Sequence, residues 1–176
     1  VGLLEGLDDG HELVPEPGLG DLAAVHRLAQ SLHQPEAPGL DALGERFEAA
    51  VTPRTRVILL CHMTNLTGQV FPVKRICRMA RERGIVSFND AAADVPPREH
   101  LSQYVREGFD LVAVSGGKGL RGPQCSGILL GRKDLIDGAR TLVAPHGGIG
   151  RGMKVGKEEI VGLVAAVERY LTVDLE

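Results

Sequence analysis

The 176-residue sequence contains no tryptophan, and aromatic residues make up only 3% of it, so few side chains could stack on a flat ligand. Cysteine is also scarce. Cys61, Cys77 and Cys125 are widely spaced and form neither a CxxC pair nor a zinc-like arrangement with histidine. We interpret them as reduced thiols and predict no metal site.

An excess of charge of one sign is lacking too. Twenty Lys and Arg residues offset 23 Asp and Glu residues, giving a net charge of -3, which argues against a nucleic-acid or anionic-membrane partner. No apolar run approaches the length of a membrane span. Glu5, Asp8 and Asp9 stand where a secretory signal would be basic, so we expect a cytoplasmic protein.

What the sequence has is a hydrophobic content of 43%, at a length that supports one domain with a proper core. Residues 1–50 are rich in Gly, Pro and acidic residues and predict only short helices, within 21–32 and 40–50. From residue 51 onward, apolar runs and amphipathic segments alternate, which indicates an α/β fold with a mostly parallel sheet. The expected strands are 57–61, 85–89, 110–115 and 126–131, and the expected helices are 72–84, 100–107, 133–140 and 157–171.

Two of these elements carry specific expectations. The continuous apolar run 57–61 is typical of a strand that is buried on both faces of its sheet. The helix 157–171 shows the clearest amphipathic pattern. Its predicted apolar face consists of Ile160, Leu163, Val164, Val167 and Leu171.

Polar residues follow three successive strands: Asn65 after the first, Asp90 after the second, and Ser115 with Lys118 after the third. Functional groups of such sheets collect at the carboxyl ends of the strands. Pyridoxal phosphate requires a lysine that forms an imine, an acid against the pyridine nitrogen, and donors for the ring hydroxyl and the phosphate. The sequence therefore predicts a pyridoxal-phosphate site in which Lys118 is the catalytic lysine.

Each residue also has a purely structural interpretation. Lys118 suits a solvated loop, Asp90 suits a turn cap, Asn65 a bend and Ser115 a helix cap. A phosphate-binding P-loop at 116–119 is disfavoured, because the Lys-Ser or Lys-Thr pair and the long glycine spacing are missing. The order of the polar residues along the sheet favours the joint site.

Two stretches resemble known families. TPRTRVILLCHMTNLTGQVFPVKRICRMARERGIVSFND, residues 52–90, resembles the class V aminotransferases, which include cysteine desulfurases and isopenicillin-N epimerase-like proteins. Residues 90–171, with DAAADVPP, SGGKGLRGPQCSG, GRKDLI and IGRGMKVGKEEIVGLVAAVERYL, are similar to selenocysteine synthase (L-seryl-tRNA selenium transferase)-like proteins and sugar-acid ammonia lyases. Both groups are pyridoxal-phosphate enzymes of fold type I, which implies a three-layer α/β/α large domain.

The resemblance implies a role for each candidate residue. Lys118 matches the imine lysine, Asp90 the acid at the pyridine nitrogen, Asn65 the residue near the ring hydroxyl, and Ser115 a phosphate contact. The segments typical of the second group also include Arg121 and Arg151, to which we assign no role.

Two departures from class V favour the second group. Class V proteins commonly have His or Gln where Ala93 stands, and tend to have His where Gly117 stands. The second group implies elimination or replacement at the β-carbon of an amino acid or amino-sugar acid. Transamination, epimerisation or desulfuration of class V type is the alternative, with Cys125 as the candidate desulfurase nucleophile.

Proteins of these families are considerably longer. We expect residues 51–176 to correspond to the central part of the large domain, residues 1–50 to lack a good phosphate cup, and the small C-terminal domain to be absent. A catalytically inactive fragment with a structural or interaction role is therefore the alternative from another class. We expect a homo-oligomer, because sites in these families take residues from both subunits.

Overall fold

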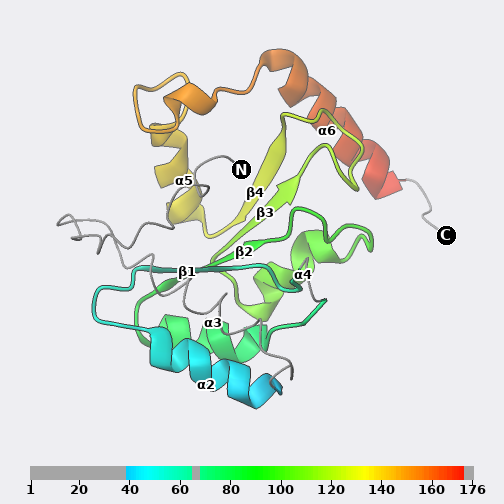
Figure 1. Cartoon of the computed structure of the whole chain (residues 1–176). Helices are drawn as coiled ribbons and strands as arrows, with labels where there is room; N and C mark the ends of the chain where they lie inside the picture. Colours follow the sequence, from blue (N-terminus) through cyan, green and yellow to red (C-terminus); the bar gives the residue numbers. More distant parts are fainter. Residues whose placement is uncertain (1–38, 65–67, 173–176) are drawn as a thin grey trace, which may run out of the picture.

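The structure is a computed structural model that describes residues 39–64 and 68–172. Its centre is a four-stranded sheet in the order β1-β2-β3-β4 (Figure 1). Strands β1 (Val57–Leu60), β2 (Val86–Asp90) and β3 (Leu111–Ser115) are parallel, and β4 (Gly127–Gly131) is antiparallel to β3. The α/β fold and the mostly parallel sheet are confirmed, and every strand lies within one residue of its predicted position.

Helices lie on both sides of this sheet (Figure 1). On one side are α2 (Leu40–Ala50), α3 (Val73–Glu82) and α4 (His100–Glu107); on the other are α5 (Lys133–Leu142) and α6 (Lys157–Thr172), joined through the short 3-10 helix η1 (Arg151–Met153). The helix expected within 21–32 lies outside the described residues. None of the described helices is both long and apolar enough to cross a membrane.

The core lies between the sheet and the group α2, α3 and α4. Helix α3 presents Ile76, Cys77 and Ala80 to it, all at most 2% exposed. The helix ends where Gly84 adopts a φ of 66° and Ile85 N–H donates to the carbonyl of Ala80 at 2.9 Å, so the expected glycine cap is present.

The prediction that the first strand is buried on both faces is wrong. Ile58 and Leu60 are buried, but Val57 and Leu59 on the opposite face are 47% and 46% exposed. No described helix covers the face of β1 that carries Val57 and Leu59. Burial therefore alternates along the strand, although all of its residues are apolar.

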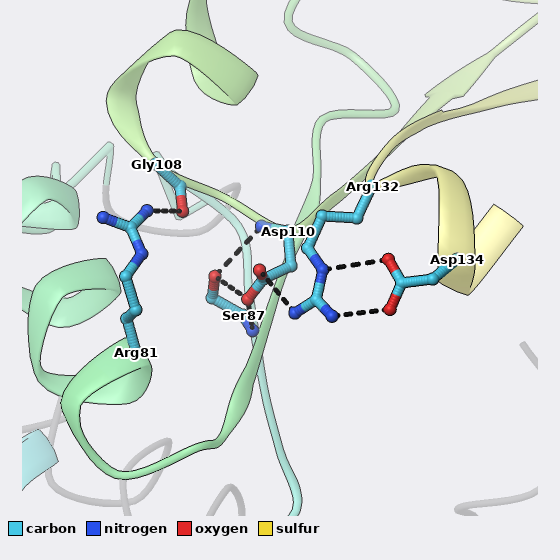
Figure 2. Close-up of polar contacts among 6 residues, drawn as sticks. All are labelled: Arg81, Ser87, Gly108, Asp110, Arg132 and Asp134. Atoms are coloured by element: carbon cyan, nitrogen blue, oxygen red, sulfur yellow. Dashed lines mark hydrogen bonds and ion pairs between the residues drawn. The ribbon is translucent and has the colours of Figure 1, made fainter.

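The amino end of β3 is fixed by an ionic network (Figure 2). The carboxylate of Asp110 accepts hydrogen bonds from the backbone N–H of Ser87 at 2.9 Å, from its hydroxyl at 3.0 Å and from Arg132 Nη1 at 3.1 Å. Arg132 also forms a two-pronged ion pair with Asp134 at the start of α5. The network joins β2, β3 and the end of β4 at the edge opposite the candidate site.

Candidate functional site

The carboxyl ends of the parallel strands bring the predicted residues to one edge of the sheet. Asn89 and Asp90 end β2, and the register pairs Leu60 with Asn89 and Asp90 with Ala113. Leu60 and Asn89 are buried on the face covered by α3 and α4. Because side chains alternate along a strand, Cys61 and Asp90 share the opposite face, with the methyl group of Ala113 beside them.

Asp90 is exposed at this edge, and its Oδ1 accepts a hydrogen bond from Ala92 N–H at 3.1 Å. The turn-capping interpretation of this residue is therefore realised. It does not compete with a cofactor role, because a carboxylate has acceptor capacity beyond one bond.

Lys118 lies in a compact glycine loop directly after β3. The loop is closed by hydrogen bonds from Gly122 N–H to the carbonyl of Gly116 at 2.7 Å and from Arg121 N–H to that of Lys118 at 2.9 Å. A Cβ atom on Gly119 would lie 1.8 Å from the carbonyl oxygen of Val95, so the loop presses against the segment that follows Asp90. The Lys118 side chain is exposed.

The pKa of Cys61 responds to the charged groups at this edge. Burial raises the pKa of the Cys61 thiol, the carboxylates of Asp90 and Asp94 raise it further, and the ammonium group of Lys118 acts in the opposite direction. Asp90, Asp94 and Lys118 therefore each act electrostatically on the Cys61 thiol. Sequence reasoning missed Cys61 as a member of this group, although its place one residue beyond Leu60 would have put it on the face of Asp90.

The other predicted residues are less well defined. Asn65 lies outside the described residues. Ser115 is half-buried at the end of β3, opposite Gly127. Cys125 is exposed in the turn before β4. Arg121 and Arg151 are both exposed.

A buried tyrosine beside the site was also missed. Tyr104 on α4 is 1% exposed, and its hydroxyl donates to Asp94 Oδ2 at 2.8 Å while lying 3.2 Å from His62 Nδ1. Burial is the main cause that raises the pKa of Tyr104 well above its ordinary value. The hydrogen bond to Asp94 and the negative charge of Asp94 raise it further. The spacing of these residues in the sequence carried no signal of this contact, because it depends on how α4 packs.

The fold is that of pyridoxal-phosphate enzymes of fold type I. A sheet edge that offers an amine, a carboxylate and a hydroxyl supplies the donor set that this cofactor uses, so the residues present fit it. Comparison with known proteins agrees. The family model for class V aminotransferases matches residues 34–151, and the chain belongs to that family.

Several relatives can be compared in detail. The chain is 38% identical over 132 residues to a 5'-C-glycyluridine monooxygenase-decarboxylase of a Streptomyces species, covering 73% of this chain and 31% of the relative. It is 33% identical over 126 residues to the D-glucosaminate-6-phosphate ammonia lyase of Salmonella typhimurium, covering 71% of this chain and 32% of the relative. A solved D-glucosaminate-6-phosphate ammonia-lyase superposes with a TM-score of 0.60 at 32% identity, covering 74% of this chain and 34% of that one.

Other relatives include L-seryl-tRNA(Sec) selenium transferases and probable cysteine desulfurases. The expected resemblance to both groups is thus confirmed. The chain spans about a third of the length of the lyase and the monooxygenase-decarboxylase.

Proposed function

We propose that the chain contributes the cofactor-binding centre of a pyridoxal-phosphate-dependent enzyme that acts on an amino acid or amino-sugar acid by elimination or replacement at the β-carbon. The observation that carries the proposal is the convergence of Lys118 and Asp90 at one sheet edge, where both charges act on Cys61. The similarity to an ammonia lyase supports elimination.

Each residue has a physical task in this proposal. Bound pyridoxal phosphate would supply an electron sink for a bond breaking at the substrate's α-carbon. Asp90 places a negative charge against the pyridine nitrogen, and Asn65 and Ser115 offer polar groups to the ring hydroxyl and the phosphate. Lys118 Nζ would hold the cofactor, and its amine is the group that would move the substrate's α-proton.

Desulfuration of class V type is the second candidate, since probable cysteine desulfurases are among the relatives. It requires a nucleophilic thiolate. Cys61 beside Asp90 is poorly suited because burial and the two carboxylates raise its pKa. Cys125 is exposed, so Cys125→Ser is the variant that tests this candidate: unchanged sulfide release would exclude Cys125 as the nucleophile.

We also propose a cytoplasmic homo-oligomer that has a small-molecule substrate and no nucleic-acid partner. Large apolar side chains on the described surface support association, among them Ile149, Met153 and Val161, which are 89%, 74% and 69% exposed. Light scattering tests the proposal, and a sharp monomer peak would contradict it.

The cofactor is tested by adding pyridoxal phosphate to the chain, reducing with borohydride and mapping the modified lysine by mass spectrometry. We expect a visible absorption band and label on Lys118. The band and the label should be lost in Lys118→Ala and kept in the matched control Lys133→Ala, whose side chain is 87% exposed on α5. No band, or label spread over surface lysines to the same extent in Lys118→Ala, would favour the inactive fragment instead.

A further inference from the structure

The loop after β1 and the segment after β2 are tied together by one buried hydroxyl. Tyr104 Oη contacts Asp94, four residues beyond Asp90, and His62, three residues before Asn65. The backbone N–H of His62 also donates to Asn89 Oδ1 at 2.9 Å. His62 is therefore anchored through both its backbone and its ring to the elements that carry the candidate site.

The donor and acceptor roles in this chain of contacts follow from the chemistry. A carboxylate only accepts hydrogen bonds, so the single proton of the Tyr104 hydroxyl is directed to Asp94. The hydroxyl oxygen can then only accept from the His62 ring, which places a proton on Nδ1. In the neutral ring, Nε2 is left with a free electron pair.

The second histidine does not disturb this order. His100 Nδ1 lies against the backbone carbonyl of Asp94, which can only accept, so His100 is the donor in that contact. It lies 3.5 Å from Tyr104 Oη and cannot supply an electron pair to the hydroxyl. The Tyr104 proton has Asp94 as its acceptor.

We infer that Tyr104 is a positioning residue that holds His62, two residues after β1, in the form protonated on Nδ1, and so keeps Nε2 as a proton acceptor. This inference deepens the proposed function, on which it rests, by fixing the hydrogen-bonding state of a histidine ring at the carboxyl ends of the strands. Among the described residues, Nε2 has no hydrogen-bond partner.

The test is nuclear magnetic resonance of the ¹⁵N-labelled chain, in which long-range ¹H–¹⁵N couplings show which ring nitrogen of a neutral histidine carries the proton. His62 is assigned through His62→Gln. In water the neutral imidazole favours the proton on Nε2, so a proton on Nδ1 in the unmodified chain is the diagnostic result. A proton on Nε2 there would overturn the inference.

Two variants test the cause. In Asp94→Ala the Tyr104 hydroxyl is free to donate to Nδ1, so the His62 proton should move to Nε2. In Tyr104→Phe the acceptor is lost and the same shift is expected, while the ring keeps its packing against His62 and His100, whose ring centres are 5.1 Å away. The exposed His146 is the internal control and should not change.

A His62 proton that stays on Nδ1 in both variants would also overturn the inference. The measurement needs no cofactor. Failure of Lys118 to capture pyridoxal phosphate would therefore refute the proposed function without imitating either result on His62.

Discussion

The ionic network at the amino end of β3 makes a sharp prediction about stability (Figure 2). The Asp110 side chain is only 14% exposed and accepts three hydrogen bonds. In Asp110→Asn the bonds from Ser87 would go to a neutral acceptor, which costs about 1 kcal/mol. The ion pair with Arg132 would also be lost, but because Arg132 is 51% exposed, solvent screening keeps that loss small. We expect the free energy of unfolding to fall by about 1–2 kcal/mol at neutral pH.

The pH dependence of this difference is fixed by the direction of the pKa shift. Burial acts to raise the pKa of Asp110, but the hydrogen bonds from Ser87 and Arg132 outweigh it and hold the pKa below its ordinary value of 3.8. A carboxyl whose pKa is lower in the folded state stabilises the fold at pH values above its unfolded pKa. That contribution is lost as the pH falls through the folded pKa. The difference in free energy of unfolding between the unmodified chain and Asp110→Asn should therefore disappear at acidic pH.

Urea unfolding of both proteins across this pH range is the assay. Asp137→Asn is the matched control, since Asp137 pairs with Lys133 on the exposed surface of α5 and should cost no more than about 0.5 kcal/mol. A difference for Asp110→Asn that stays constant from neutral pH to below 3.8 would refute the charge argument. If Asp110→Asn loses no more free energy of unfolding than Asp137→Asn does, the stabilising role of the network would be refuted.

The remaining predictions concern the thiols and the glycine loop. Alkylation should modify the exposed Cys125 first, Cys61 more slowly, and Cys77 last, because burial raises the pKa of Cys77 to about 11; peptide mapping over time gives the order. Pyridoxal phosphate should protect Cys61 but not Cys125, and equal rates with and without it would contradict a cofactor over the Asp90 face. Gly119→Ala should lower the melting temperature and displace the lysine loop, since its Cβ would meet a backbone carbonyl at 1.8 Å. Gly138→Ala, with open space in α5, should be neutral or stabilise by up to about 1 kcal/mol.

The sequence predicted elements well where local signals were strong. Apolar runs located the strands, and glycines at 84 and 108 marked helix ends at which the backbone adopts positive φ. The direction of β4 was not specified, although the connection 116–126 is too short for the crossover that a parallel strand requires. Counting that connection would have predicted the antiparallel pairing.

Packing between elements could not be predicted from the same signals. The predicted face of α6 is wider than the face that is buried: Leu163 and Val167 pack against the core, but Ile160 and Val164 are 52% and 54% exposed. The reason is that α6 packs on the glycine loop, where Gly162 faces Pro123, instead of lying flat on the sheet. The apolar face of a helix shows which side chains are available for burial. It does not show which other surface of the protein packs against them.

The same holds for the candidate site. Strand ends placed Asp90 and Lys118 at one edge because that relation follows from the topology of a parallel sheet. Cys61 and Tyr104 were missed, since one depends on side-chain alternation beyond a strand end and the other on the position of α4.

One departure from the class V pattern gains a physical reason from this packing. A Cβ atom on Gly117 would lie 2.6 Å from Gln124, whose side-chain amide donates to the carbonyl of Gly117 at 3.2 Å. The place that a histidine ring would need is therefore filled by the turn before β4. Gly117 and Gln124 act as a pair, and replacing the glycine alone would force the turn to move. The absence of a side chain at the position before Lys118 is thus built into the loop.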